Sequence, residues 1–191
     1  MKSKKLFQLL TIALSFAIVS CGDMNKTVVN ADMTKNMDAV KNVFTAFETG
    51  NTENLGNYIA DNMVEHSPDP NVKSTGLEGV KEMIKLYRTS FPDLKQTVTG
   101  MWADKDMVIA HYTMTGMNSG PMGEMPATNK SVNVNGVDIV RFENGKAVEH
   151  WGYWEEMKMM QQLGMMPEMG AAGDASKMAM EEKMKMEEKK K

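Results

Sequence analysis

Residues 131–156 carry the clearest alternation of apolar and polar positions in this chain. Two strand-like runs meet at Asn144-Gly145, and an Asn-Gly pair readily takes the positive φ angles of a tight hairpin turn. Alternate side chains of a strand point to opposite faces, and the first run has apolar residues on both, such as Val140 on one face and Ile139 on the other. The pattern predicts a β-hairpin inside a larger sheet, covered on both faces.

The N-terminal half of the chain shows a helical period instead. Met37, Val40 and Phe44 recur three or four residues apart, which predicts a helix over residues 36–50. A second run predicts a helix that begins at Gly76 or Leu77 and ends at Ser90, before a Phe-Pro pair. Between them, residues 55–59 suggest a short helix, followed by a segment that leads into a Pro-rich loop.

Beyond residue 95 the apolar period shortens to two. Residues 96–102 and 107–116 alternate in this way, with a turn at Asp104-Lys105-Asp106, and a last short helix is predicted over 157–163. Helices come first and an antiparallel meander second. This order predicts an α+β fold in which a curved antiparallel sheet packs on N-terminal helices.

Residues 1–20 have the composition of an export signal, with early lysines and an apolar run too short to span a bilayer comfortably. The run ends at Ile18-Val19-Ser20-Cys21-Gly22, which resembles a bacterial lipobox, whose cysteine is lipidated. Cys21 is the only cysteine, so it has no partner for an internal disulfide. The alternative is an ordinary cleaved signal with a cysteine nearby. The prediction is a lipid-anchored protein of the bacterial cell envelope, facing the periplasm or the cell surface.

The remaining composition describes one domain with appendages. Residues 21–35 are polar and suggest a tether, residues 36–164 form the predicted domain, and residues 165–191 form a Met/Lys/Glu-rich tail that we expect to be mobile. The 22 methionines are interpreted as flexible apolar filler, although those of the tail could instead collect Cu(I). The net charge is -3 and the lysines form no stripe with interleaved aromatics, so we predict no nucleic-acid partner.

Three histidines, His66, His111 and His150, are the first candidates for chemistry, since all lie in or beside predicted strands. Three imidazoles could hold zinc, but none has the spacing of a paired ligand motif. We therefore predict pocket or core histidines and no metal.

Two carboxyl groups are further candidates. Asp138 shares a strand face with Val140, so it is either a buried acid that acts in catalysis or a partner of a neighbouring strand. Glu155 is either a catalytic acid or a cap of the last helix.

A cluster of aromatic residues lies at the end of the second strand of the hairpin and is a candidate for the wall of a pocket. Strand parity separates Trp151 and Tyr153 from His150 and Trp154, so only one of these pairs can face a pocket. Trp102 on an earlier strand is a second candidate for the wall. The alternative for these rings is a sheet core or a dimer interface.

Several short motifs together resemble a known family, the SnoaL-like polyketide cyclases and ester cyclases of the nuclear-transport-factor-2-like superfamily. The motifs are Phe91-Pro92-Asp93-Leu94, Thr115-Gly116 with Gly120, Gly136-Val137-Asp138-Ile139, Arg141-Phe142, Asn144-Gly145-Lys146, Glu149-His150-Trp151 and Gln162-Leu163-Gly164. The resemblance implies a cone-shaped sheet around an apolar pocket, pairing into homodimers through the sheet, and an aldol ring closure that uses a carboxylate and no cofactor. Where many relatives carry an acid directly after the His-Trp pair, this chain has Gly152.

Three classes of function remain open from the sequence. The first is a cofactor-free cyclase, isomerase or hydrolase that acts on a small apolar carbonyl or ester compound, with His150, Asp138 and Glu155 as catalytic residues. Its pocket would also contain His66, Trp102, His111 and Trp154. The others are a pocket that binds a small apolar molecule without catalysis and a structural lipoprotein that dimerises.

Overall fold

The computed structural model describes residues 31–166. The predictions about the export signal, Cys21, residues 21–30 of the tether and residues 167–191 of the tail lie outside the described residues. The described elements, in chain order, are α1 (Ala31–Thr49), the 3-10 helix η1 (Leu55–Asn57), β1 (Ile59–Glu65), α2 (Gly76–Ser90), β2 (Lys95–Asp104), β3 (Met107–Met117), β4 (Ser131–Glu143), β5 (Lys146–Trp154) and α3 (Glu156–Gln162). They confirm the predicted α+β class.

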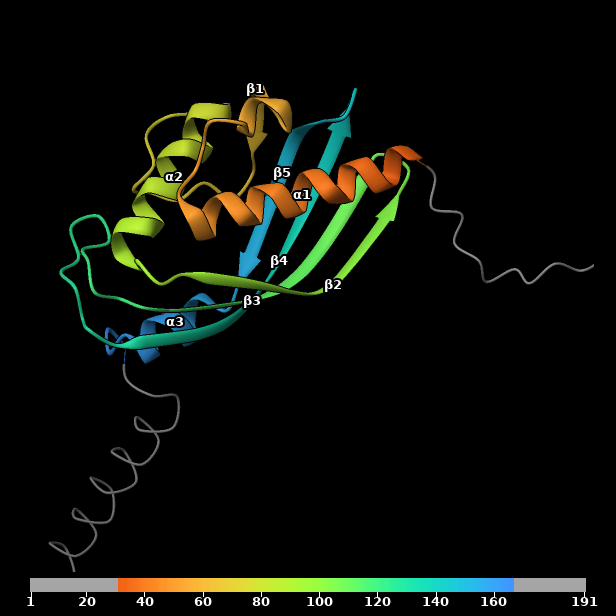
Figure 1. The fold of residues 1–191 in the computed structure, drawn as a ribbon. Coiled ribbons are helices and arrows are strands. Elements are labelled where there is room, and N and C mark those ends of the chain that lie inside the picture. Colours follow the sequence, from red (N-terminus) through yellow and green to blue (C-terminus); the bar gives the residue numbers. More distant parts are fainter. Residues whose placement is uncertain (1–30, 167–191) are drawn as a thin grey trace, which may run out of the picture.

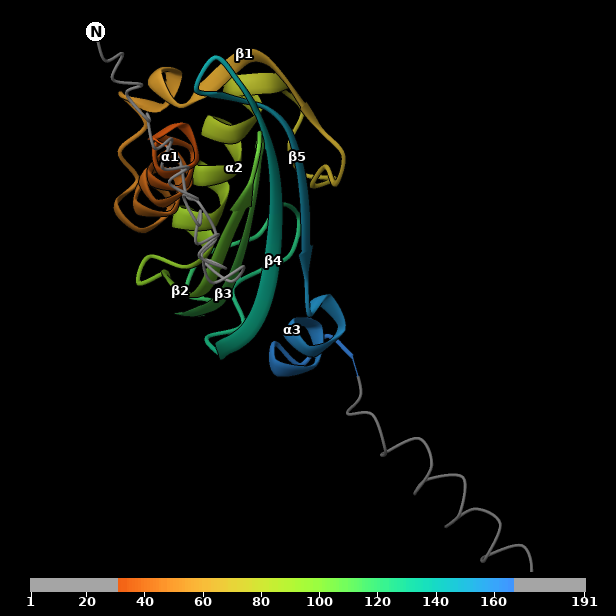
Figure 2. The ribbon, with the colours of Figure 1, turned by 90° about the vertical axis from the view of Figure 1, so that its right-hand side faces the viewer.

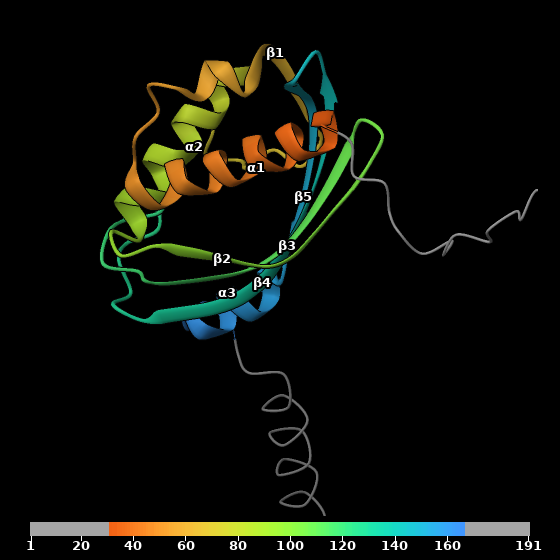
Figure 3. The same ribbon diagram turned by 45° about the vertical axis from the view of Figure 1, so that its right-hand side comes forward.

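The strands form one curved, five-stranded sheet in the order β1-β5-β4-β3-β2. Every neighbouring pair is antiparallel except β1 and β5, which run parallel. Register shifts within β2, between Val98 and Gly100, and beside Arg141 in the β4–β5 pair add to the bend of the sheet. Figures 1 and 3 show the sheet curling around α1. The sheet therefore has a concave face toward the helices and a convex face on the other side.

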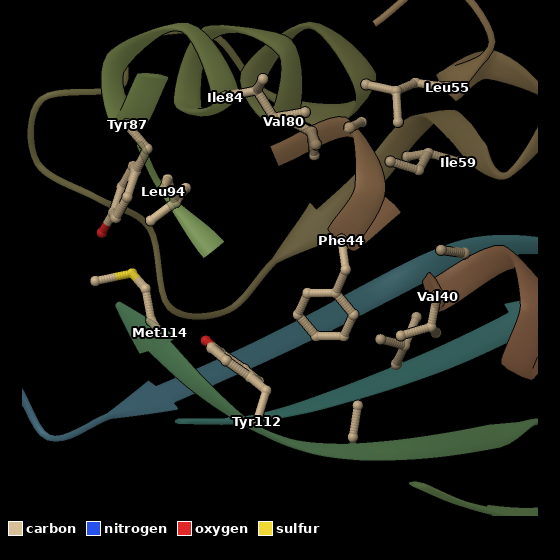
Figure 4. Close-up of a cluster of buried hydrophobic side chains, with 14 of the residues drawn as sticks. Val40, Phe44, Leu55, Ile59, Val80, Ile84, Tyr87, Leu94, Tyr112 and Met114 are labelled. Atoms are coloured by element: carbon tan, nitrogen blue, oxygen red, sulfur yellow. The ribbon is translucent and has the colours of Figure 1, made fainter. Parts of the chain in front are cut away.

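Helices α1 and α2 cover the concave face and supply much of the core. Phe44 of α1 packs its ring against Tyr112 of β3, with 5.0 Å between the ring centroids. Figure 4 shows Phe44 pointing from its helix toward Tyr112, with Tyr87 of α2 nearby. Figure 2, turned by 90°, shows α1 and α2 on the same side of the sheet, while α3 lies at its lower end. Within residues 31–166, no helix is long and apolar enough to cross a membrane.

Helix α2, strands β2 and β3, and the β4–β5 hairpin lie where the sequence predicts them. Asn144 and Gly145 take φ angles of 50° and 77° at the tight turn, as the Asn-Gly pair requires. The first helix, however, begins at Ala31 rather than Asn36. Met33 is buried, so the apolar stripe extends a further turn toward the N-terminus than the prediction assumed.

The segment from residue 55 to residue 66 departs most from the prediction. Only Leu55–Asn57 forms a short 3-10 helix, and Ile59–Glu65 forms strand β1. β1 pairs with β5, and Glu65 lies in register with His150. The sheet is thus mixed rather than purely antiparallel. Pairing between segments so far apart in the chain leaves no local mark in the sequence.

Candidate functional site

A cavity of about 110 Å³ lies between the concave face of the sheet and the two long helices. Most of its wall is apolar. The residues that bring polar atoms to the wall are Tyr58, Glu65, Tyr87, Gln96, Tyr112, Asp138, His150 and Trp154. An apolar cavity with a few convergent polar groups is the usual form of a small-molecule site.

The register of the sheet sets these polar groups side by side. Three inward-facing rows cross the sheet: Tyr112 with Gly136 and Trp154, then Asp138 with Gly152, then Val140 with His150 and Glu65. Successive rows lie two residues apart along the strands, which is about 7 Å. Of the two aromatic pairs that strand parity separates, His150 and Trp154 face the cavity, and Tyr153 is exposed on the other face.

His150 lies between two carboxylates. Its Nδ1 is 2.6 Å from Oε2 of Glu65, and its Nε2 forms a longer ion pair with Oδ1 of Asp138, at 3.6 Å. Burial opposes the positive charge on the ring, but Asp138 and Glu65 together outweigh it and raise the pKa of His150 to about 10. The imidazolium therefore persists at neutral pH. The side chains of Glu65, Asp138 and His150 are 16, 18 and 24% exposed, so a ligand can reach them.

Glu65 is the residue of this cluster that the sequence did not reveal. The prediction placed His66 beside the pocket, but successive residues of a strand point to opposite faces. Glu65 points inward, and His66 lies on the convex side, where it stacks on Trp151 at 4.3 Å and its Nε2 is 2.8 Å from Glu149 Oε2. Met63 is buried and shares the parity of Glu65, so the sequence contained this signal once residues 59–65 are read as a strand.

Trp102 and His111 also lie outside the cavity wall, contrary to the prediction. The bulge after Val98 reverses the alternation of β2, so Trp102 turns outward and is 61% exposed. Its ring lies across Gly100, where a Cβ would come within 2.4 Å of it. His111 lies between the buried, inward-facing residues of β3, and its ring contacts Thr99 on the opposite face.

Glu155 stands apart from the cavity, contrary to its predicted catalytic role. Its Oε2 accepts hydrogen bonds from the backbone N–H of Asn135 and from Lys158, both at 2.8 Å. The bond to Asn135 connects the start of α3 to β4. The hydrogen bond from Lys158, followed by that from Asn135, lowers the pKa of this exposed carboxyl. Among residues 31–166, no group of three or more His, Cys, Asp or Glu side chains is arranged to hold a metal ion.

Two tyrosines in the wall remain protonated over the working range of pH. Burial, followed by the charge of Asp138, raises the pKa of Tyr112. Burial, followed by the charge of Asp69, raises that of Tyr87. Both phenols are therefore hydrogen-bond donors, and the Tyr112 hydroxyl is directed at Asp138.

Two polar atoms of the cavity wall have no partner. They are Nε1 of Trp154 and Oε1 of Gln96, and among the side chains of residues 31–166 no other nitrogen or oxygen is both buried and unpaired. A buried donor or acceptor without a partner costs about 1–3 kcal/mol. Both atoms belong to side chains that line the cavity.

Comparison with known proteins matches residues 37–163 to the SnoaL-like polyketide cyclases. The chain belongs to this family. Among curated proteins there is no match. Among solved structures, similar folds include TsrD from Streptomyces laurentii, at 23% identity and a TM-score of 0.65, covering 72% of this chain and all of that one.

Two further structures share the SnoaL-like fold. Wild-type IdmH from Streptomyces antibioticus is 26% identical, with a TM-score of 0.59 over 68% of this chain and 98% of its own. A SnoaL-like polyketide cyclase from Agrobacterium tumefaciens strain C58 is 18% identical, with a TM-score of 0.56 over 67% of this chain and 97% of its own.

Proposed function

We propose that this protein is a cofactor-free cyclase or isomerase in which Asp138 moves a proton at a carbon atom next to a carbonyl group. The observation that carries the proposal is the Asp138 carboxylate, which lies beside the His150 imidazolium in the wall of an apolar cavity. Membership of the SnoaL-like polyketide cyclases supports the same class of reaction.

The size of the cavity restricts the substrate. A cavity of about 110 Å³ has room for a small organic molecule. The substrate, or the part of it that enters, is therefore small and has a mostly apolar surface.

The three charged side chains have separate roles in this proposal. Asp138 takes a proton from the carbon atom and later returns it, either to another carbon or to the alkoxide that ring closure creates. His150 holds the Asp138 carboxylate in place and balances its charge. Glu65 holds His150 from the other side, at 2.6 Å, so that the ring cannot turn away.

A hydrolase that forms an acyl-enzyme fits the cavity less well. Such an enzyme uses a serine, threonine or cysteine as nucleophile. The wall, as far as the structure describes it, contains none of these residues. Proton transfer is thus the reaction that the available groups support best.

The test is deuterium exchange at the carbon atoms beside the carbonyl of 2-indanone, a ketone of suitable size, followed by proton NMR in D₂O. The wild-type protein should accelerate exchange, and Asp138→Asn should lower the rate by about a hundredfold or more while the protein stays folded. Asp104→Asn, at the exposed end of β2, is the matched control. Binding of the ketone without exchange would favour the alternative function, a protein that binds small molecules without catalysis.

We also propose that the mature protein is anchored to the bacterial envelope through a lipid on Cys21. The support is the sequence alone: the early lysines, the apolar run and the Ile-Val-Ser-Cys-Gly segment. An envelope location would give the cavity access to small apolar compounds that enter or leave the cell.

A homodimer through the convex face of the sheet is the third part of the proposal. Trp102, Ile109, Ile139 and Trp151 lie in register across β2, β3, β4 and β5 and form an apolar row, which we call the convex row. Trp102 is 61% exposed and Ile109 is 40% exposed. Ile139 and Trp151 are partly buried, and His66 stacks on Trp151. A row of large apolar side chains with two exposed members is typical of a protein interface, and a second copy would cover it.

A further inference from the structure

The indole N–H of Trp154 is a buried hydrogen-bond donor without a partner, on a side chain of the cavity wall. The indole nitrogen can only donate, so the group that satisfies it must bring an acceptor. A ligand with a carbonyl or an anionic oxygen provides one.

Trp154 lies one row away from the Asp138 carboxylate. It pairs across the sheet with Gly136, and Asp138 lies two residues further along β4. Tyr112 pairs with Gly136 from the other side, and its hydroxyl would be 2.6 Å from a Cβ at position 136. The bare backbone of Gly136 thus admits the Tyr112 hydroxyl, which has Asp138 as its hydrogen-bond partner, so the donor of this row that has no partner is the Trp154 N–H.

His150 cannot take this part, although it is the strongest donor of the site. Its Nδ1 faces Glu65 and its Nε2 faces Asp138, so both N–H groups already point at carboxylates. A substrate oxygen would have to displace one of these charged contacts. The Trp154 indole requires no such displacement, because its N–H has no hydrogen-bond partner.

We propose that Trp154 binds the carbonyl oxygen of the substrate and stabilises the enolate oxygen that forms when Asp138 removes a proton. This inference rests on the proposed function and names its substrate class, a small enolisable ketone or ester. The C–H bond breaks, its electron pair forms the C=C bond, the carbonyl π pair moves to oxygen, and the proton goes to Asp138. The total charge is unchanged, since the carboxylate becomes neutral as the oxygen becomes negative.

Two readouts test the inference in the whole chain. The first is the affinity for 2-indanone relative to indane, which lacks the oxygen, and the second is the infrared carbonyl stretch of bound 2-indanone. The wild-type protein should prefer the ketone and shift the stretch to lower frequency. Trp154→Phe should reduce the preference by about tenfold, return the stretch toward its solution value and slow exchange by about a hundredfold. Tyr153→Phe, which removes an exposed ring donor on the opposite face of the sheet, should alter none of these.

The outcomes separate this inference from the proposed function. If Asp138→Asn abolishes exchange but Trp154→Phe leaves the stretch and the preference unchanged, Trp154 does not hold the oxygen and the inference is wrong. If the wild-type protein shifts the stretch through Trp154 but exchanges no deuterium, the inference stands for binding and the catalytic proposal fails. Should Trp154→Phe not fold, the wild-type stretch and the wild-type preference for the ketone decide, and a wild-type stretch at its solution value overturns the inference.

Discussion

Asp138 lies directly opposite Gly152 across the β4–β5 pair, and its Oδ1 is 3.5 Å from the position that a Cβ on residue 152 would occupy. The same Cβ would lie 3.0 Å from Cε1 of His150. Position 152 is where the family resemblance leads us to expect an acid. In this chain the carboxyl group belongs to Asp138 on the neighbouring strand β4, and it lies beside the space that a side chain at position 152 would enter.

Gly152→Ala should therefore disturb the site by crowding alone. The added methyl group must push against His150, and overpacking of this kind costs about 1–3 kcal/mol in the free energy of unfolding. Urea unfolding measures the loss. Gly56→Ala is the matched control, because its Cβ would make an ordinary 3.5 Å contact with Leu77, and a change larger than about 0.5 kcal/mol there would show that the effect is not specific to the site.

Moving the acid across the strand pair should restore part of the reaction. Asp138→Ala removes the proposed base, and a second change, Gly152→Asp, returns a carboxylate from the opposite strand. We expect the double variant to exchange the protons of 2-indanone at least about tenfold faster than Asp138→Ala alone. Gly152→Asn in the same background controls for size. Equal rates in the Asp and Asn double variants would contradict the idea that a carboxylate at this place is sufficient.

The protonated state of His150 predicts how stability depends on pH. Its folded-state pKa is about 10, above its ordinary value of 6.5, so the folded state favours the proton. The resulting stabilisation is complete below about pH 6.5 and is lost as the pH rises toward 10, with a fall of a few kcal/mol in the free energy of unfolding. His150→Gln should flatten this part of the profile. An NMR titration that gives His150 a pKa near 6.5 would show that the carboxylate pairing is absent.

The convex row should hold two copies of the chain together. Trp102→Lys and Ile109→Lys place charges on side chains that are exposed in one copy, so each copy should fold normally while the dimer dissociates. Sedimentation or light scattering reports the mass in solution. Thr97→Lys, exposed on β2 but not in the convex row, should leave the mass unchanged. A wild-type protein that is a monomer throughout would remove the basis for this interface.

Lipidation of Cys21 can be tested in cells. The wild-type protein should incorporate labelled palmitate and sediment with membranes, whereas Cys21→Ser should do neither, because no other cysteine can take the lipid. Retention of Cys21→Ser in the membrane fraction, with no label in the wild type, would contradict the lipobox interpretation.

The sequence alone determined the elements whose cause is local. An Asn-Gly pair predicted the tight turn at residues 144–145, because few other residues take positive φ angles without strain. The helical period predicted α2 to its last residue, since proline follows at position 92. Parity along β5 separated His150 and Trp154 from Trp151 and Tyr153, although it did not say which pair faced inward.

Only the tertiary structure decided which side chains meet in the cavity. One bulge after Val98 turned Trp102 to the outside, because an extra residue reverses the alternation of every later position in the strand. Glu65 reached His150 through a parallel pairing between β1 and β5, whose strands are far apart in the chain. Such pairing depends on how the whole sheet closes around α1 and α2, and a local sequence pattern does not determine that closure.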